Sequence, residues 1–466
     1  MKNVLACACL VVAVVGCGAI KAQPGACGTA AQCTDPAAPF CVDSECQATC
    51  AVNSDCTDAT QPLCSAGACI QCETNTDCAD PNASICDTGT HECRGCTIDS
   101  ECAGGVCVEA QGTCVADADV AFVANNGTSN TCTRTAPCGS IASAIANAPT
   151  RPVIHVLGGD LLDSALTLSG THIIDGENTI FGASGGTSVT VTGPATITLE
   201  GFQFTEPPAM MMLPAITMTG QANVTLYNVT VSGAGGPAIV TQAGATLNLS
   251  HSHVGVAGVG RHEVDCINGI LNADQNVFLT SFISNGTGAC TAKITRNRFD
   301  SNSDGSVQIS GGQVIMENNL IIHEDGFNDS ILVENLAAGS TVRYNTVVNT
   351  TGAPSDGAAI DCDNSAEITS NVFAYNSMHS VVGQGCNIKF SVFDTVSITS
   401  AGTGNQVVDI DSIFVDRANG DYHLAANSIA KMAAEPGQTM TKVDFDGNPR
   451  PNPVGTTSDS GAFEAP

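Results

Sequence analysis

The sequence predicts an all-β protein in which short parallel strands form a solenoid, preceded by a small disulfide-rich repeat region. One pattern recurs nine times between residues 197 and 393: apolar, any, apolar, any, any, a slot residue, any, apolar. Successive slots are 20 to 27 residues apart. Units of this length that cannot bury their own apolar face are typical of solenoids. Most of the 25 cysteines lie ahead of the repeats at regular spacing.

Each unit reads as a short strand, because apolar residues two positions apart place both side chains on one face. A helical repeat would require apolar residues at i, i+3, i+4 and i+7, which these segments lack. The residue two positions after every slot is large and apolar. The slots are Phe202, Val229, Ser252, Asn276, Asn297, Asn319, Asn345, Asn371 and Ser391.

Five consecutive slots hold asparagine, which predicts an internal asparagine ladder. Asparagine tolerates the left-handed backbone of a tight bend, so we expect the slot residue to form the bend. Amides stacked at the strand spacing of roughly 4.8 Å can hydrogen-bond from one coil to the next. The predicted ladder consists of Asn276, Asn297, Asn319, Asn345 and Asn371.

The units ITRNRF, VIMENNLI, VRYNTVV and ITSNVF resemble the repeat of right-handed parallel β-helix proteins, a fold that includes the pectate lyases. The resemblance implies a right-handed parallel β-helix solenoid over residues 171–420. Residues 120–170 would supply its amino-terminal cap and first strands, because an asparagine-glycine turn, an expected Cys132–Cys138 disulfide and an SIASAI segment capped by Ser140 resemble that cap. Residues 421–466 resemble the closing segment of anchored β-helix proteins, through DYHL, DFDGNPR and DSGAFE.

The charge balance limits the classes of partner. The chain has 45 acidic and 15 basic residues and a net charge of −30. This charge argues against nucleic acid as a partner. It also disfavours polyanionic polysaccharides unless Ca²⁺ bridges the charges. Without tryptophan and with 4 tyrosines, the chain has few flat platforms for sugar rings.

Residues 1–22 read as a signal peptide and anchor. An apolar run too short to span a bilayer ends in Val-Val-Gly-Cys17, which resembles the lipobox of bacterial lipoproteins. The resemblance implies lipidation of Cys17, a membrane lipid anchor, and a place on the outer membrane or cell surface of a bacterium. An ordinary secretory signal cut after Ala22 is the alternative, and both leave 22 cysteines free to pair.

Residues 23–119 hold sixteen cysteines in four groups of four, opening at Cys27, Cys50, Cys72 and Cys96. Units this small have no core of their own, so disulfides must hold them. The alternative is zinc, because Cys69-x2-Cys72 and Cys93-x2-Cys96 have ligand spacing. Export and a single histidine in the segment favour disulfides. The spacing is similar to the cysteine-rich modules of dickkopf proteins, which does not transfer function. Within the coils, Cys266–Cys290 and Cys362–Cys386 have a separation of one coil, which predicts two disulfides.

Candidate catalytic and metal residues are few. Aligning the repeats places His323, Glu324 and Tyr375 on one polar strip, where a lyase or hydrolase could work from the outer face. Asp361 and Asp363 flank Cys362 on one strand face and are candidate ligands for Ca²⁺, the one cofactor that the sequence suggests. The favoured interpretation is a solvated turn for the first group and the general abundance of acidic residues for the second. Lys293, Arg296 and Arg298 form the only basic cluster.

The favoured hypothesis is a surface-anchored lipoprotein whose β-helix binds or adheres to a polysaccharide or a cell-surface or matrix protein. The evidence is the anchor, the cysteine-rich segment and the lack of a clear catalytic constellation. The alternative is an envelope-displayed polysaccharide lyase or glycoside hydrolase. A purely structural envelope component is a third hypothesis, with neither ligand nor activity.

Overall fold

The computed structural model describes residues 40–42, 45–47, 49–159, 165–182, 189–205, 214–232, 237–255, 262–279, 281–286, 288–301, 305–323, 329–349, 358–363, 365–374, 386–394, 402–437, 442–452 and 455–465. The chain divides into two compact units, Met1–Ala116 and Asp117–Pro466. The first ends just before the boundary expected at residue 119. Each unit is described by itself.

The first unit is a row of small disulfide modules, each with an antiparallel hairpin. In the three modules that open at Cys50, Cys72 and Cys96, the first cysteine bonds the third and the second bonds the fourth. The hairpins are β1 (Phe40–Val42) with β2 (Glu45–Gln47), β3 (Leu63–Ser65) with β4 (Ala68–Ile70), β5 (Ile85–Asp87) with β6 (Glu92–Arg94), and β7 (Gly105–Val108) with β8 (Thr113–Ala116). The 3₁₀ turns are η2 (Asn53–Asp55), η3 (Asn75–Asp77), η4 (Pro81–Ala83) and η5 (Asp99–Glu101).

In the three modules that open at Cys50, Cys72 and Cys96, the acidic residue before the second cysteine stabilises a turn. Asp77 Oδ2 accepts the backbone N–H groups of Glu73 and Thr74 at 3.0 and 2.8 Å. Asp55 and Glu101 accept equivalent N–H groups in their own modules. These carboxylates therefore satisfy the N–H groups that a short helical turn leaves free.

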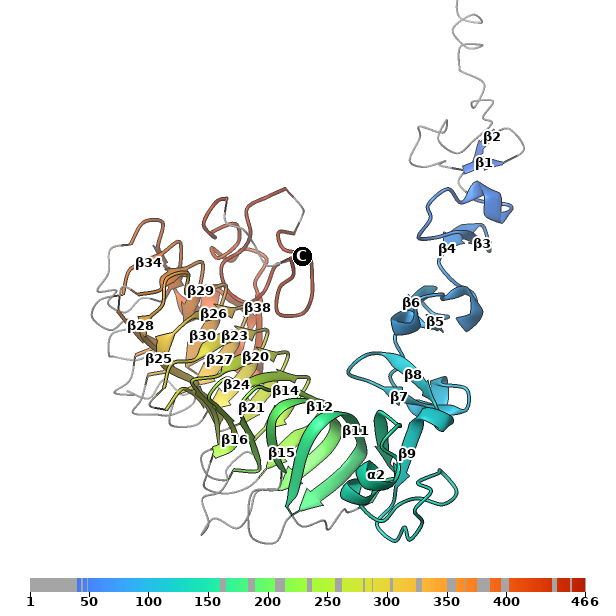
Figure 1. Ribbon diagram of the computed structural model, residues 1–466. Helices are drawn as coiled ribbons and strands as arrows, with labels where there is room; N and C mark the ends of the chain where they lie inside the picture. The colour runs from blue at the N-terminus through green and yellow to red at the C-terminus, as the bar shows by residue number, and fades with distance from the viewer. Residues whose placement is uncertain are drawn as a thin grey trace, which may run out of the picture. The chain divides into compact units, whose positions relative to one another are not determined.

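The second unit is a parallel β-solenoid with three sheets (Figure 1). It is entered through η6 (Asp117–Asp119). The first sheet consists of β9 (Val120–Val123), β10 (Val153–Val156), β11 (Leu166–Gly182), β12 (Val189–Thr205), β14 (Ala222–Tyr227), β17 (Thr246–Ser250), β20 (Ile270–Asp274), β23 (Thr291–Thr295), β26 (Val314–Glu317), β29 (Thr341–Arg343), β32 (Glu367–Thr369) and β34 (Ile388–Lys389).

The long strand β12 also contributes to the other two sheets. The second sheet continues through β15 (Thr230–Ser232), β18 (His253–Val254), β21 (Val277–Leu279), β24 (Arg298–Ser301), β27 (Leu320–His323), β30 (Thr346–Asn349), β33 (Val372–Ala374), β35 (Val392–Phe393) and β36 (Gln406–Val407). The third continues through β13 (Ile216–Thr219), β16 (Pro237–Gln242), β19 (His262–Ile267), β22 (Ser281–Ser284), β25 (Val307–Gly312), β28 (Ile331–Leu336) and β31 (Ile360–Cys362).

The slot residue does not itself have the left-handed backbone of the bend, and this corrects one expectation. The left-handed residue of each bend is the one before the slot, as in Arg296 (φ 54°) and Tyr344 (φ 56°). Asn297 itself is fully buried and donates its Nδ2 to the carbonyls of Ala273 and Thr295, both at 2.9 Å. Asparagine is therefore used here because its amide satisfies the carbonyls of the bend, which no apolar side chain could do.

The predicted asparagine ladder is confirmed. Each amide Nδ2 donates to the Oδ1 of the next slot: Asn276 to Asn297 at 2.9 Å, Asn297 to Asn319 at 3.0 Å, Asn319 to Asn345 at 2.8 Å and Asn345 to Asn371 at 3.1 Å. The backbone N–H of each slot donates to the same oxygen, for example from Asn297 to Asn319 at 2.9 Å. Beside the ladder, the apolar positions stack, with Phe278 and Phe299 4.6 Å apart between ring centroids.

Helix α2 (Ile141–Asn147) packs at the first coil, as the sequence predicts. Ser140 caps it by accepting the N–H of Ser143, and Ile141 and Ala144 are buried in the solenoid core. The three predicted disulfides are present in the second unit: Cys132–Cys138, Cys266–Cys290 and Cys362–Cys386. The two that join neighbouring coils have Cα–Cα distances of 5.5 and 5.2 Å.

The C-terminal segment, residues 402–465, lies along a side of the solenoid. It contains η7 (Ile410–Ser412), β37 (Phe414–Asp416), η8 (Arg417–Asn419) and β38 (Asp421–Leu424). Its Ile413, Leu424 and Phe463 bury the outward apolar residues of β27, β30, β33 and β35. The buried Arg450 pairs with Glu464 at 2.9 Å and lies over the Tyr344 ring at 4.5 Å. The DFDGNPR and DSGAFE motifs therefore anchor this segment.

Candidate functional site: two grooves on the first sheet

The outward face of the first sheet carries polar side chains where the strands alternate. On β20 the core residues Leu271 and Ala273 alternate with the outward Asn272 and Asp274. On β23 the outward residues Lys293 and Thr295 lie beside them, because the registers pair Asn272 with Lys293 and Asp274 with Thr295. This alternation is what a sheet with one covered face requires.

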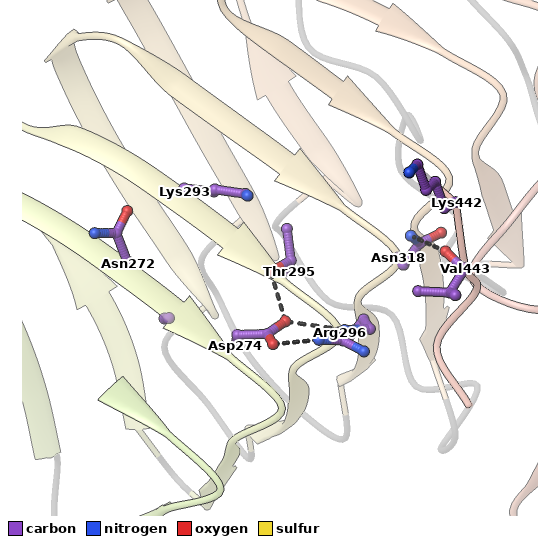
Figure 2. Close-up of a pocket in the computed structure, with 9 residues that line it drawn as sticks. Asn272, Asp274, Lys293, Thr295, Arg296, Asn318, Lys442 and Val443 are labelled. Carbon is purple, nitrogen blue, oxygen red and sulfur yellow. Dashed lines mark hydrogen bonds and ion pairs between the residues drawn. The ribbon is translucent and has the colours of Figure 1, made fainter. Parts of the chain in front are cut away.

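An open groove of about 510 Å³ lies over these strands. Lys442 and Val443 of the C-terminal segment form its other wall, held by the Asn318 Nδ2, which donates to the Val443 carbonyl at 3.0 Å (Figure 2). The solenoid and the C-terminal segment thus build this groove together. The lining residues, here called the first groove, are Asn272, Ala273, Asp274, Lys293, Thr295, Arg296, Asn318, Lys442 and Val443.

The groove has a local excess of positive charge in a strongly acidic protein. Its one carboxylate, Asp274, is held by Arg296, whose Nε donates at 3.0 Å, and by the Thr295 hydroxyl at 2.6 Å. The exposed Lys293 and Lys442 form no ion pair among the described residues. The two ammonium groups of Lys293 and Lys442 are therefore available to a ligand.

A second groove, of about 550 Å³, lies farther along the same sheet. The registers place Lys293, Ile315, Thr341 and Glu367 in one outward row, so both grooves share this row. The second groove is lined by Gly339, Ser340, Thr341, Ser365, Ala366, Glu367, Asn387 and Lys389.

An outward amide ladder leads to the first groove from the other side. Asn272 Nδ2 donates to Asn248 Oδ1 at 2.9 Å, and Asn248 Nδ2 donates to Asn223 Oδ1 at 3.0 Å. Unlike the internal ladder, this one faces solvent. It extends the polar strip of the sheet across two further coils.

The C-terminal segment that supplies Lys442 also holds a histidine between two aspartates, here called the His423 clamp. His423 on β38 contacts Asp421 Oδ1 through Nδ1 at 2.6 Å and Asp446 Oδ2 through Nε2 at 2.7 Å. Its ring packs on Phe463 with centroids 4.6 Å apart. Burial lowers the pKa of His423, but the hydrogen bonds and charges of the two aspartates outweigh burial and raise this pKa above its usual value. For the carboxyl group of Glu464 in the same segment, burial disfavours the charged form and raises the pKa to about 7.

The predicted catalytic strip is only partly described. The strands pair His323 with Ser301 and with Asn349, as the repeat alignment predicts. His323 ends β27, but its side chain lies outside the described residues, and so do Glu324 and Tyr375 entirely. The role of these three residues therefore stays a prediction.

The structure describes both predicted calcium ligands, Asp361 and Asp363, and among the described residues it brings no third ligand to them. Asp363 accepts the N–H of Asn335 at 2.8 Å and both the N–H and hydroxyl of Ser365. These hydrogen bonds, the Ser365 hydroxyl foremost, lower the pKa of Asp363. Asp361 lies near the half-buried Asp329, and its charge contributes to the raised pKa of Asp329 after burial. Neither Asp361 nor Asp363 belongs to a cluster of three potential ligands within the described residues. Ca²⁺, which takes six to eight oxygens, stays a prediction here.

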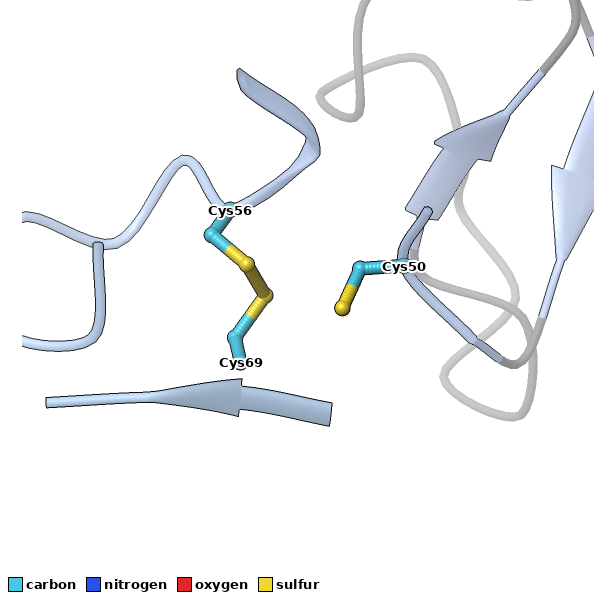
Figure 3. Close-up of side chains that lie close together, drawn as sticks. All are labelled: Cys50, Cys56 and Cys69. Atoms are coloured by element: carbon cyan, nitrogen blue, oxygen red, sulfur yellow. A yellow bond between two sulfur atoms is a disulfide. The ribbon is translucent and has the colours of Figure 1, made fainter. Parts of the chain in front are cut away.

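The cysteines that have the spacing of zinc ligands are all bonded to other cysteines in disulfides. Cys69 bonds Cys56 and Cys72 bonds Cys86, so no thiolate remains at either. Sulfur atoms of the two disulfides in a module lie close together, as Cys50 does beside Cys56–Cys69 (Figure 3). Cys17, the predicted lipidation site, lies outside the described residues.

Comparison with known protein families finds no match, and neither does comparison with curated proteins. Among solved structures, that of the pectate lyase Pel9A is similar, with a TM-score of 0.31 and 14% identity over 74% of this chain and 96% of that chain. A likeness of this size bears on neither substrate nor reaction. Among the described residues, no helix is long and apolar enough to cross a membrane.

Proposed function

We propose that this protein is an exported, lipid-anchored surface protein whose solenoid binds a linear glycan without cleaving it. The observation that carries the proposal is the pair of grooves on one outward row of the first sheet. Their linings offer amide, hydroxyl and ammonium groups, which hydrogen-bond to the hydroxyl and carboxylate oxygens of sugars.

A linear polymer suits this row better than a compact ligand does. Lys293 in the first groove and Glu367 in the second are joined by three successive strand pairings. At roughly 4.8 Å per strand, they are about 14 Å apart along the solenoid. A chain of several sugar units that crosses the strands would contact both grooves, whereas a single sugar would fill only one.

Binding without cleavage fits the carboxylates of the grooves. A glycoside hydrolase needs two carboxyl groups on either side of one glycosidic bond. Of the described lining residues, Asp274 is the only carboxylate in the first groove and Glu367 the only one in the second. They lie on β20 and β32, which are separated by three strands of the sheet, so they cannot act on one bond.

Surface display is supported by sequence and by covalent chemistry. Disulfides throughout both units require an oxidising compartment. The lipobox-like end at Cys17 supplies a membrane lipid as the anchor, and the disulfide modules would act as a spacer between membrane and solenoid. A net charge of −30 leaves nucleic acid out as a partner.

The test is a glycan-array and calorimetry screen of the purified protein, with a parallel assay for new reducing or unsaturated chain ends. Replacing both Lys293 and Lys442 with alanine should weaken binding at least about tenfold, because each ammonium loses a charge-assisted hydrogen bond. Lys431→Ala, outside both grooves, is the matched control. New chain ends would make the protein an enzyme, and full affinity in the double variant would place the ligand elsewhere.

A further inference from the structure

The His423 clamp touches the same loop that forms a wall of the first groove. Asp446 is at the tip of a tight turn in which Asp444 Oδ1 accepts the N–H groups of Asp446 and Asn448 at 3.0 and 2.8 Å. Val443, immediately before this turn, bridges to Pro449 and lines the groove. The groove wall and the clamp are therefore a few residues apart on one loop, residues 442–452.

Both ring nitrogens of His423 face carboxylate oxygens at hydrogen-bond distance. A carboxylate oxygen only accepts, so each contact requires an N–H donor, and imidazole carries two N–H groups only when protonated. Neutral His423 would keep one donor and turn a lone pair towards the other carboxylate at less than 3 Å. One of the two links must then open.

We propose that His423 is a proton-operated clamp that holds the Lys442–Val443 wall in place, so that the first groove binds its ligand more tightly when His423 is protonated. The proposal rests on the proposed glycan binding and adds its regulation. The wall has a second attachment to the solenoid at Asn318, so opening the clamp loosens the wall without detaching the segment.

The groups that face His423 are Asp421 from its own strand, Asp446 from the loop, and the Phe463 ring from residues 455–465. The pKa of His423 is raised in the folded protein by the two aspartates against the effect of burial. A raised folded pKa means that the clamp is fully formed below the unfolded value of about 6.5 and is lost as the pH rises through the folded value. Binding should therefore weaken towards alkaline pH.

The experiment compares the full chain with His423→Gln and Asp446→Asn, and uses the exposed His253→Gln on β18 as the control. Hydrogen exchange of residues 442–452 is measured for all variants at the same pH, once at pH 6 and once at pH 9. Polygalacturonate and cellohexaose serve as the ligand probes. Neither probe titrates between these pH values, so a change in affinity reports on the protein.

In the expected result, the loop exchanges faster in His423→Gln than in the wild type at pH 6, and equally fast at pH 9. Wild-type affinity should fall at least about fivefold between the two pH values, a usual size for coupled sites, and that of His423→Gln should stay constant. Equal loop exchange at pH 6 overturns the clamp. A protected loop with pH-independent affinity overturns its coupling to the groove. If neither probe binds at either pH, the proposed glycan binding fails for these probes, and loop exchange alone decides whether the clamp exists.

Discussion

The two units of this protein are held together in different ways. In the cysteine-rich unit each of the three modules that open at Cys50, Cys72 and Cys96 has two disulfides, and a small buried cluster consists of Ile85 with three half-cystines. The solenoid has one continuous apolar core that runs through its coils, with a hydrogen-bonded amide ladder inside it. The difference teaches that covalent links replace a core where the chain is too short to build one.

Reduction of the disulfides should reveal the largest difference in stability between the two units. Module disulfides close loops of 11 to 15 residues, and each is worth about 3 kcal/mol in the unfolded chain. We expect a mild reductant to unfold the modules while the solenoid stays folded. Hydrogen exchange and proteolysis of the reduced chain measure this. Loss of both units at one reductant concentration would mean that the solenoid also depends on its disulfides.

The amide ladder should show how much of the solenoid depends on polar groups. Asn319 Nδ2 donates to the carbonyls of Ile294 and Glu317 and to Asn345. Asn319→Ala removes these three hydrogen bonds and also the Oδ1 that accepts the buried Asn297 N–H, and should cost about 3 kcal/mol in the free energy of unfolding. The outward Asn248→Ala should change it by about 0.5 kcal/mol or less. Urea titration of both variants decides, and equal losses would show that the inner ladder adds nothing beyond the outer one.

The smallest expected effect is a loss of stability at acid pH in a single disulfide module. The Arg94 hydrogen bond, helped by the Thr97 N–H, lowers the pKa of Glu101 from 4.5 to about 2. Because the folded value is depressed, its stabilisation is present above about 4.5 and is lost as the pH falls towards 2. An NMR titration of the Thr97 amide proton should have its midpoint near 2. A midpoint near 4.5 would show that the carboxylate is not held in solution.

The strands and the ladder could be predicted because period-two alternation and a repeated slot fix which side chains face inward. The column of left-handed residues could not be predicted. It contains Gly201, His251, Gln275 and Tyr344, which share no chemistry, because the bend is imposed by the stacked coils rather than by residue preference.

The covering of the second sheet left a signal that the repeat analysis did not use. Strand β27 reads Leu-Ile-Ile and β30 reads Val-Val, continuous apolar runs of the kind found where both faces of a sheet are buried. The sequence indicated part of the first groove, because Lys293 and Arg296 belong to its basic cluster. Lys442 could not be added, because it reaches the groove by a fold-back of the chain that no local pattern encodes.

The internal ladder also has a direction. Each amide-to-amide bond runs from the Nδ2 of the earlier coil to the Oδ1 of the later one, from Asn276 to Asn297, Asn319, Asn345 and finally Asn371. A coil that comes loose at the late end therefore deprives its neighbour of an acceptor, and unravelling would advance one coil at a time. The C-terminal segment lies against those late coils and hydrogen-bonds to Ser370 and Phe390. These contacts should therefore resist mechanical unfolding of the solenoid at the end where the loss of coils would begin.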